Sequence, residues 1–241
     1  MKHVERFLAG VFCISVLVVL VISAVEVAVY ADYGYFRKEY EKYNVNDPRG
    51  IVNMEMDELI NVTVKMMDYL RGDRDNLDII AEIDDENKEF FNEREKSHMA
   101  DVRDLFVGAL AVRWFALGMA VLSLVNLFLL LHWKDIKVLL LRAYLTTIAV
   151  LMGILSVIGI WACIDFTNAF YKFHALFFSD YEWILDIHTS RLINILPEGF
   201  FVDTAIRIVV IFIVFILIMG AILLLLKKVK QRKYNLGGTY E

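Results

Sequence analysis

The stretch FLAGVFCISVLVVLVISAVEVAVYA, residues 7–31, decides the fold class of this chain. It holds enough apolar residues to cross the hydrocarbon core of a bilayer, which takes about 20 of them in a helix. It also exceeds the roughly 7–15 apolar residues at the centre of a cleaved signal peptide, so we predict an uncleaved membrane span. Runs of the same kind follow at 107–131, 138–163 and 206–226. The sequence therefore predicts an all-α polytopic membrane protein with four transmembrane helices.

The composition agrees with a membrane protein and disfavours several other classes. Hydrophobic residues make up 59% of the 241 positions, which is more than a soluble domain usually carries. The net charge is −5 and the basic residues form no broad patch, so we expect no nucleic-acid partner. Both cysteines, Cys13 and Cys163, lie inside apolar runs. We interpret them as packing residues rather than as a disulfide or a metal-binding pair.

The orientation of the chain follows from the basic residues that flank the spans. They stand before the first span, between the second and third, and after the fourth: Lys2, Arg6, Lys134, Lys137, Arg142 and the run KKVKQRK at 227–233. Short flanks rich in Lys and Arg remain in the cytoplasm. The predicted division is a cytoplasmic N-terminus and first span (1–31), an extracytoplasmic subdomain (32–106), the second span (107–131), a cytoplasmic loop (132–137), the third span (138–163), an extracytoplasmic aromatic loop (164–205), the fourth span (206–226) and a cytoplasmic basic tail (227–241).

The extracytoplasmic subdomain is predicted to be mostly helical. In MEMDELINVTVKMMDYLRG, residues 54–72, apolar residues recur every three or four positions, which predicts a helix capped by Gly72. The stretch DIIAEIDDENKEFF, residues 78–91, predicts two short strands around a polar turn at Asp84–Asn87. The stretch NEREKSHMADVRDLF, residues 92–106, has helical spacing again and is expected to run into the second span.

The aromatic loop holds too many rings for the thin belt that aromatic residues form at a membrane interface. We expect short interfacial segments there that shape a groove for lipid. The candidates for contact with an acyl chain are Phe173, Phe177, Phe178 and Trp183. Two charged residues of the spans, Arg113 in the second and Glu26 in the first, are further candidates for binding lipid or substrate, although either can also reach the headgroups.

Two histidines stand out among the residues that can perform chemistry. His98 and His174 each lie a short distance from the outer end of a predicted span, so both can meet near the membrane surface. Asp101 follows His98 by three residues and Arg94 precedes it by four, which puts all three on one face of a helix. A carboxylate in that position can hold an imidazole in one tautomer and raise its basicity.

Other chemistries fit the sequence less well. His98, His174, His188 and Asp101 have the side chains of a zinc shell, but no HExxH motif or paired-cysteine spacing accompanies them. The G-x-S-x-G motif of a serine hydrolase is missing from the sequence. A metal-dependent membrane hydrolase that uses these histidines, and a non-enzymatic sensor or assembly factor, remain as alternatives.

Three motifs in combination resemble the lipoprotein intramolecular transacylase family of four-span bacterial membrane proteins. They are E-x-x-H-M-x-D-V at 95–102, F-H-x-x-F-F at 173–178 and L-I-x-x-x-P-x-x-F-F at 192–201. The resemblance implies that the sn-2 acyl chain of a diacylglyceryl-modified lipoprotein moves to the α-amine of its N-terminal cysteine, giving the lyso-form. It implies lipoproteins and membrane lipids as partners, the bacterial cytoplasmic membrane as location, and no cofactor or metal.

The same resemblance implies that His98 and His174 are the catalytic residues. We expect His98, oriented by Asp101, to take the proton of the α-amine, and His174 to polarise the ester or protonate the departing glyceryl oxygen. The sequence alone does not separate the base from the acid, so the exchanged roles stay open. The chain departs from the family pattern at Ile187, where a proline is common, and at Arg191, where an acidic residue is common. Both departures lie in the aromatic loop, outside the two histidine motifs.

Overall fold

The computed structural model of the chain describes residues 2–47, 49–178 and 183–236, without the side chains beyond 226. The last part of the predicted basic tail, 237–241, lies outside the described residues. The chain divides into two compact units, which are described separately here. Unit 1 consists of Met1–Ala24, Val112–Ile160 and Val209–Glu241, and unit 2 of Val25–Ala111 and Trp161–Ile208.

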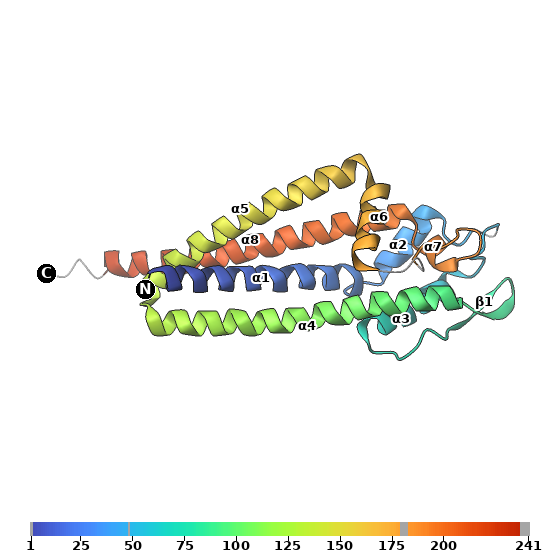
Figure 1. The fold of residues 1–241 in the computed structure, drawn as a ribbon, viewed down its shortest axis with the longest axis horizontal. Helices are drawn as coiled ribbons and strands as arrows, with labels where there is room; N and C mark the ends of the chain where they lie inside the picture. The colour runs from blue at the N-terminus through green and yellow to red at the C-terminus, as the bar shows by residue number, and fades with distance from the viewer. Residues whose placement is uncertain (1, 48, 179–182, 237–241) are drawn as a thin grey trace. The chain divides into compact units, whose positions relative to one another are not determined.

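Four long helices confirm the predicted fold class. In the described part of the chain, four helices are long and apolar enough to cross a membrane (Figure 1). They are α1 (Lys2–Tyr30), α4 (Glu93–Leu130), α5 (Trp133–Ile164) and α8 (Glu198–Leu236). As expected, α4 begins well before the second apolar run and continues through it without a break.

The helices of unit 1 expose many large apolar side chains, an arrangement that would be unfavourable in water. Phe115 on α4, Val157 on α5 and Leu217 on α8 are each at least 66% exposed. A lipid environment accounts for this pattern, since apolar side chains and internally bonded helices are what a bilayer core accepts. Inside the unit, the Tyr144 hydroxyl on α5 donates to the carbonyl of Ile216 on α8 at 2.5 Å.

Unit 2 is built on two amphipathic helices, α2 (Gly34–Tyr43) and α3 (Met56–Arg71). The predicted helix over α3 is confirmed, and its apolar face is buried. It ends at Gly72, whose φ of 89° is the left-handed conformation that glycine adopts at little cost. The Tyr40 and Thr63 hydroxyls share a buried hydrogen bond of 2.9 Å, which joins α2 to α3.

A β-hairpin follows α3, as predicted, but its turn is shorter than expected. The strands β1 (Ile80–Ile83) and β2 (Glu86–Glu89) are antiparallel, with Ile83 opposite Glu86. The turn is therefore Asp84–Asp85 rather than Asp84–Asn87. Both turn residues have positive φ, 54° and 60°, which suits a two-residue hairpin turn because its twist matches that of the strands.

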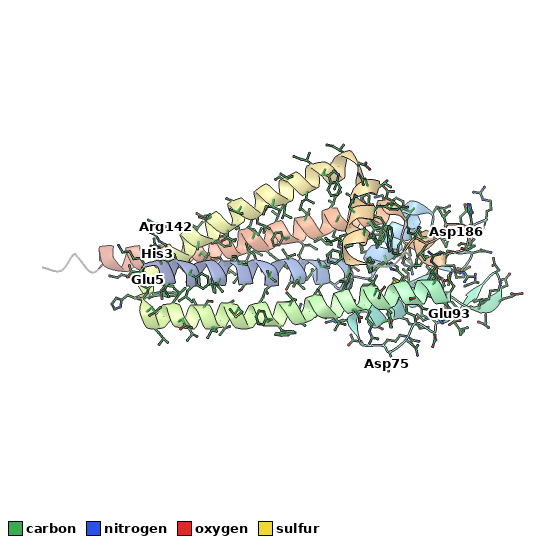
Figure 2. All side chains as sticks on the ribbon, viewed as in Figure 1. His3, Glu5, Asp75, Glu93, Arg142 and Asp186 are labelled. Atoms are coloured by element: carbon green, nitrogen blue, oxygen red, sulfur yellow. The ribbon has the colours of Figure 1, made fainter. Side chains whose placement is uncertain are left out.

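The remaining elements of unit 2 come from the aromatic loop. They are α6 (Phe166–Phe177), which starts at the side-chain cap Asp165, and the short helix α7 (Arg191–Ile195), which starts at the cap Ser190. Figure 2 labels three exposed acidic side chains of unit 2 that lie outside or at the ends of its elements, Asp75, Glu93 and Asp186. The surface of unit 2 thus carries acidic side chains, together with exposed apolar ones such as Leu176 on α6, and its interior holds the two histidines.

Candidate active site

The structure brings His98 and His174 together inside unit 2. His98 lies near the start of α4 and His174 near the end of α6, and their ring centroids are 6.1 Å apart. Both side chains are almost completely buried, with exposed fractions of 8% and 9%. At this separation, the two imidazoles can both reach the reacting groups of one bound ester and amine.

Aromatic rings surround the pair. Phe170 lies 4.1 Å from the His174 ring, and Trp183 stacks on it at 4.9 Å. Phe178 contacts both imidazoles, at 5.1 Å from His98 and 5.5 Å from His174. Such a lining admits acyl chains and excludes water, which strengthens electrostatic interactions inside the site and suppresses hydrolysis. We refer to Phe170, Phe178 and Trp183 as the aromatic nest.

One hydrogen bond fixes the tautomer of His174. Its Nδ1 lies 2.8 Å from the backbone carbonyl of Phe170, one helical turn earlier. A carbonyl oxygen can only accept, so Nδ1 carries the proton and Nε2 holds the lone pair. Burial lowers the pKa of His174 below its ordinary value, and the bond to Phe170 opposes that shift only in part. The neutral ring, with Nε2 free to accept a proton, is therefore the form favoured at neutral pH.

A buried carboxylate that is not among the predicted site residues lies one turn before His98 on α4. Glu95 is 1% exposed, and its Oε2 accepts the backbone N–H of Asn92 at 2.7 Å. Its Oε1 accepts the Ser190 hydroxyl at 2.5 Å and the Leu192 N–H at 2.8 Å. Glu95 thus caps α4 and ties the start of that helix to the start of α7. The Asn-x-x-Glu spacing of a capping box was visible in the sequence, but its partners in α7 were not.

Among the remaining predicted site residues, some lie close to the pair. Asp101 and Arg94 lie on α4 one turn either side of His98, with Asp101 half-buried and Arg94 exposed. The Phe173 ring lies 5.6 Å from the His174 ring. Phe177 contacts Phe173, with 4.8 Å between the two ring centroids. The proposed supporting role of Asp101 and Arg94 stays a prediction.

The other candidates have different surroundings. Arg113 belongs to unit 1, where its guanidinium lies 5.6 Å from the Trp114 ring. Glu26 forms an ion pair of 3.2 Å with Arg71 at the end of α3. His188 is exposed in a turn before α7. Across residues 2–47, 49–178 and 183–236, no group of three or more His, Cys, Asp or Glu side chains is arranged to hold a metal ion.

Comparison with known proteins gives one family. Residues 10–201 match the family described as lipoprotein intramolecular transacylase Lit. The in meso structure of this membrane-integral transacylase from Bacillus cereus superposes with a TM-score of 0.74 at 21% identity, covering 96% of this chain and all of that one. A variant of it with one histidine replaced by arginine gives 0.73 at 20% identity, covering 96% of each chain. No curated protein matches the sequence. At these identities, the structural likeness supports the fold.

Proposed function

The chain belongs to the lipoprotein intramolecular transacylase family, and from that membership we propose the specific reaction that it catalyses. It is an enzyme of the multi-pass membrane class, and its substrate is a bacterial lipoprotein carrying a diacylglyceryl group on the sulfur of its N-terminal cysteine. The acyl chain on the sn-2 oxygen moves to the free α-amine of the same cysteine. The product is the lyso-form lipoprotein, with one acyl chain left on the glyceryl group.

The reaction is an ester aminolysis that needs no second substrate. The α-amine attacks the sn-2 carbonyl carbon, an amide C–N bond forms, and the bond from carbon to the glyceryl oxygen breaks. One proton leaves the nitrogen and one arrives at the glyceryl oxygen, so the protons balance. An α-amine has a pKa near 8, so about a tenth of it is neutral at pH 7 and able to attack.

The geometry of His174 supports a single imidazole as proton carrier. Its Nε2 holds the lone pair because the Phe170 carbonyl keeps the proton on Nδ1. Nitrogen and glyceryl oxygen are bonded to the same carbon in the tetrahedral intermediate, so Nε2 can take the proton from one and return it to the other. This assigns the base role to His174 rather than to His98, the base expected from the sequence.

His98 then stabilises the charge that develops on the carbonyl oxygen. A ring N–H aimed at the oxyanion lowers the barrier because its dipole is already in place when the charge appears. Its ring lies 6.1 Å from that of His174, across the position where we place the reacting carbon. Asp101, three residues along α4, has the spacing to orient the ring through its other nitrogen.

Holding the amine and the ester together supplies a large part of the rate. Oriented intramolecular reactions reach effective molarities of roughly 10⁵–10⁸ M, which explains why few polar residues suffice. The aromatic nest keeps water from competing with the amine for the ester. The observation that carries the proposal is this pairing of two buried imidazoles, one with a defined tautomer, inside an aromatic lining.

The test measures the initial rate of lyso-form production by purified variants on a diacylglyceryl lipopeptide, with mass spectrometry of the peptide. Loss of a general base costs about 10²–10⁴-fold, and loss of an oxyanion donor about 10²–10³-fold. His174→Ala and His98→Ala should therefore each lose most of the activity. The exposed His188 serves as matched control, and His188→Ala should retain the activity of the wild-type enzyme.

Glutamine variants separate the two roles. An amide N–H can still donate a hydrogen bond to an oxyanion, whereas an amide cannot act as a base. His98→Gln should therefore be at least about tenfold faster than His98→Ala, within the loss that one donor accounts for. His174→Gln should be as slow as His174→Ala. If His174→Gln were faster than His174→Ala while His98→Gln were as slow as His98→Ala, the two roles would be reversed. Full activity of both His98→Ala and His174→Ala would overturn the proposal.

A further inference from the structure

A cavity of about 550 Å³ opens beside α6, outside the pair of histidines. Ligand pockets in proteins range over roughly 300–1,000 Å³, so its size suits a bound molecule. Much of the surface that lines it is apolar, but unlike the aromatic nest it also carries charged and amide side chains. It is formed within unit 2 by the first three turns of α6, the cap before them and one further ring: Asp165, Thr167, Asn168, Tyr171, Lys172, Ala175 and Trp183.

Trp183 is the wall that this cavity shares with the active site. Its ring stacks on the His174 imidazole with a centroid distance of 4.9 Å and an interplanar angle of 28°. The same ring meets Tyr171, a residue of the cavity lining, edge to face at 5.1 Å. The cavity therefore begins one aromatic ring away from the imidazole that acts on the α-amine.

We propose that this cavity binds the polypeptide backbone of the lipoprotein immediately after its modified cysteine. The inference rests on the proposed function, because it uses the position of the reacting amine. That amine belongs to the cysteine whose own carbonyl continues into the peptide. When the amine lies at His174, the next residues must leave the site within a few ångströms of the ring. The cavity on the other side of Trp183 lies next to this position and offers polar side chains to a peptide backbone.

The chemistry of the lining fits a peptide better than a lipid headgroup phosphate. The ammonium of Lys172 and the amide of Asn168 can donate to backbone carbonyls, and the Asn168 amide oxygen can accept from a backbone N–H. The carboxylate of Asp165 stands in the same lining, and Glu198 accepts the hydroxyl of Thr167 at its edge. These carboxylates offset the single lysine and repel a phosphate, whereas a backbone is uncharged and alternates donors with acceptors.

The two faces of α6 divide the substrate between them. Asn168 and Lys172 lie one turn apart on the cavity side and are both exposed. Phe173 and Phe177 lie one turn apart on a different face, where their rings contact each other at 4.8 Å. One amphipathic helix thus presents a polar face to the peptide part of the lipoprotein and an apolar face to its acyl part.

The experiment compares two substrates that differ only in the peptide. One is diacylglyceryl cysteine amide and the other is a diacylglyceryl hexapeptide with uncharged residues after the cysteine. The variant Asn168→Leu/Lys172→Met removes the donors while keeping similar side-chain volume. For the hexapeptide, kcat/KM should fall about tenfold, the loss expected for two hydrogen bonds, and the loss should lie in KM. For the cysteine amide, kcat/KM should stay within about twofold of wild type.

The matched control is Lys38→Met, which removes an exposed lysine of α2 and should leave both substrates unaffected. Equal losses for the two substrates, or a wild-type enzyme that does not distinguish them, would overturn the inference while leaving the reaction in place. Inhibition by glycerol phosphate that the double variant relieves would identify a headgroup site and overturn it as well. Failure of both substrates to give any lyso-form would instead overturn the proposed function.

Discussion

The carbonyl of Phe170 decides which nitrogen of His174 is available for chemistry. The tautomer of an imidazole is set by the hydrogen bond that one of its nitrogens makes, often to a backbone carbonyl or a carboxylate. Here, the acceptor is the backbone of the same helix one turn away, at 2.8 Å. The orientation of the ring is therefore set by α6 itself. A side chain in another element is not needed to choose the tautomer.

The lowered pKa of His174 makes a prediction for the dependence of activity on pH. Burial disfavours the imidazolium, so the pKa lies below 6.5, and only the neutral ring can accept a proton. Activity must therefore be lost as pH falls through that pKa. A plot of log kcat/KM against pH from 5 to 9 should bend near 8, where the substrate amine titrates, and should show no second bend until below 6.5. A second bend at or above 6.5 would contradict the assignment of His174 as base.

At the scale of elements, Glu95 joins two helix starts with one carboxylate. Glu95→Ala would leave three donors without their acceptor: the Leu192 N–H and the Ser190 hydroxyl, which are buried, and the part-buried Asn92 N–H. Each unsatisfied buried donor costs about 1–3 kcal/mol, so the free energy of unfolding should fall by about 2 kcal/mol or more. The measurement is the unfolding of the purified protein in detergent, followed by tryptophan fluorescence.

The control lies two residues away on the same helix. The side chain of Glu93 is 91% exposed, and its ion pair with Lys96 is of the exposed kind that contributes little. Glu93→Ala should change the free energy of unfolding by no more than about 0.5 kcal/mol. Similar unfolding curves for the Glu93 and Glu95 variants would show that the carboxylate at 95 does not hold α4 to α7.

The elements could be predicted from the sequence where their signal is local. The helix over α3 shows its period within 16 residues, and Gly72 marks its end. The hairpin was predicted from its polar centre, but the sequence could not show that Asp84 and Asp85 both adopt positive φ, so the turn came out two residues too long. Glu95 was missed as a structural residue because the groups that it binds lie 95 and 97 residues further along the chain.

The site was predictable only in part for the same reason. His98 and His174 were chosen from their position near the ends of spans and from the family motifs. Periodicity could not reveal that Trp183 stacks on His174, since Trp183 lies beyond the end of α6 and outside its helical period. The tautomer of His174 requires the position of a backbone oxygen, which a sequence does not contain.

For the whole molecule, the four spans were predictable because the hydrophobicity of a span is summed over about 20 residues, so a single polar residue changes the sum little. The side of the membrane on which unit 2 lies is a prediction from charge. Reporter enzymes that work only outside the cytoplasm should be active when fused after residue 85 and inactive when fused after residue 135. The opposite pattern would place both histidines on the cytoplasmic side and contradict the proposed location of the reaction.

The hydrogen bond between Glu95 and Ser190 also constrains when unit 2 can fold during synthesis of the chain. The two residues are 95 positions apart, and a ribosome adds about 5–20 residues per second, so roughly 5–19 s pass between their syntheses. Throughout that interval, the carboxylate lacks the hydroxyl and the N–H of the α7 start, and water must satisfy it. The first turn of α4 therefore stays hydrated while α5 and α6 are made. Unit 2 can close around its histidines only after the ribosome has passed residue 192.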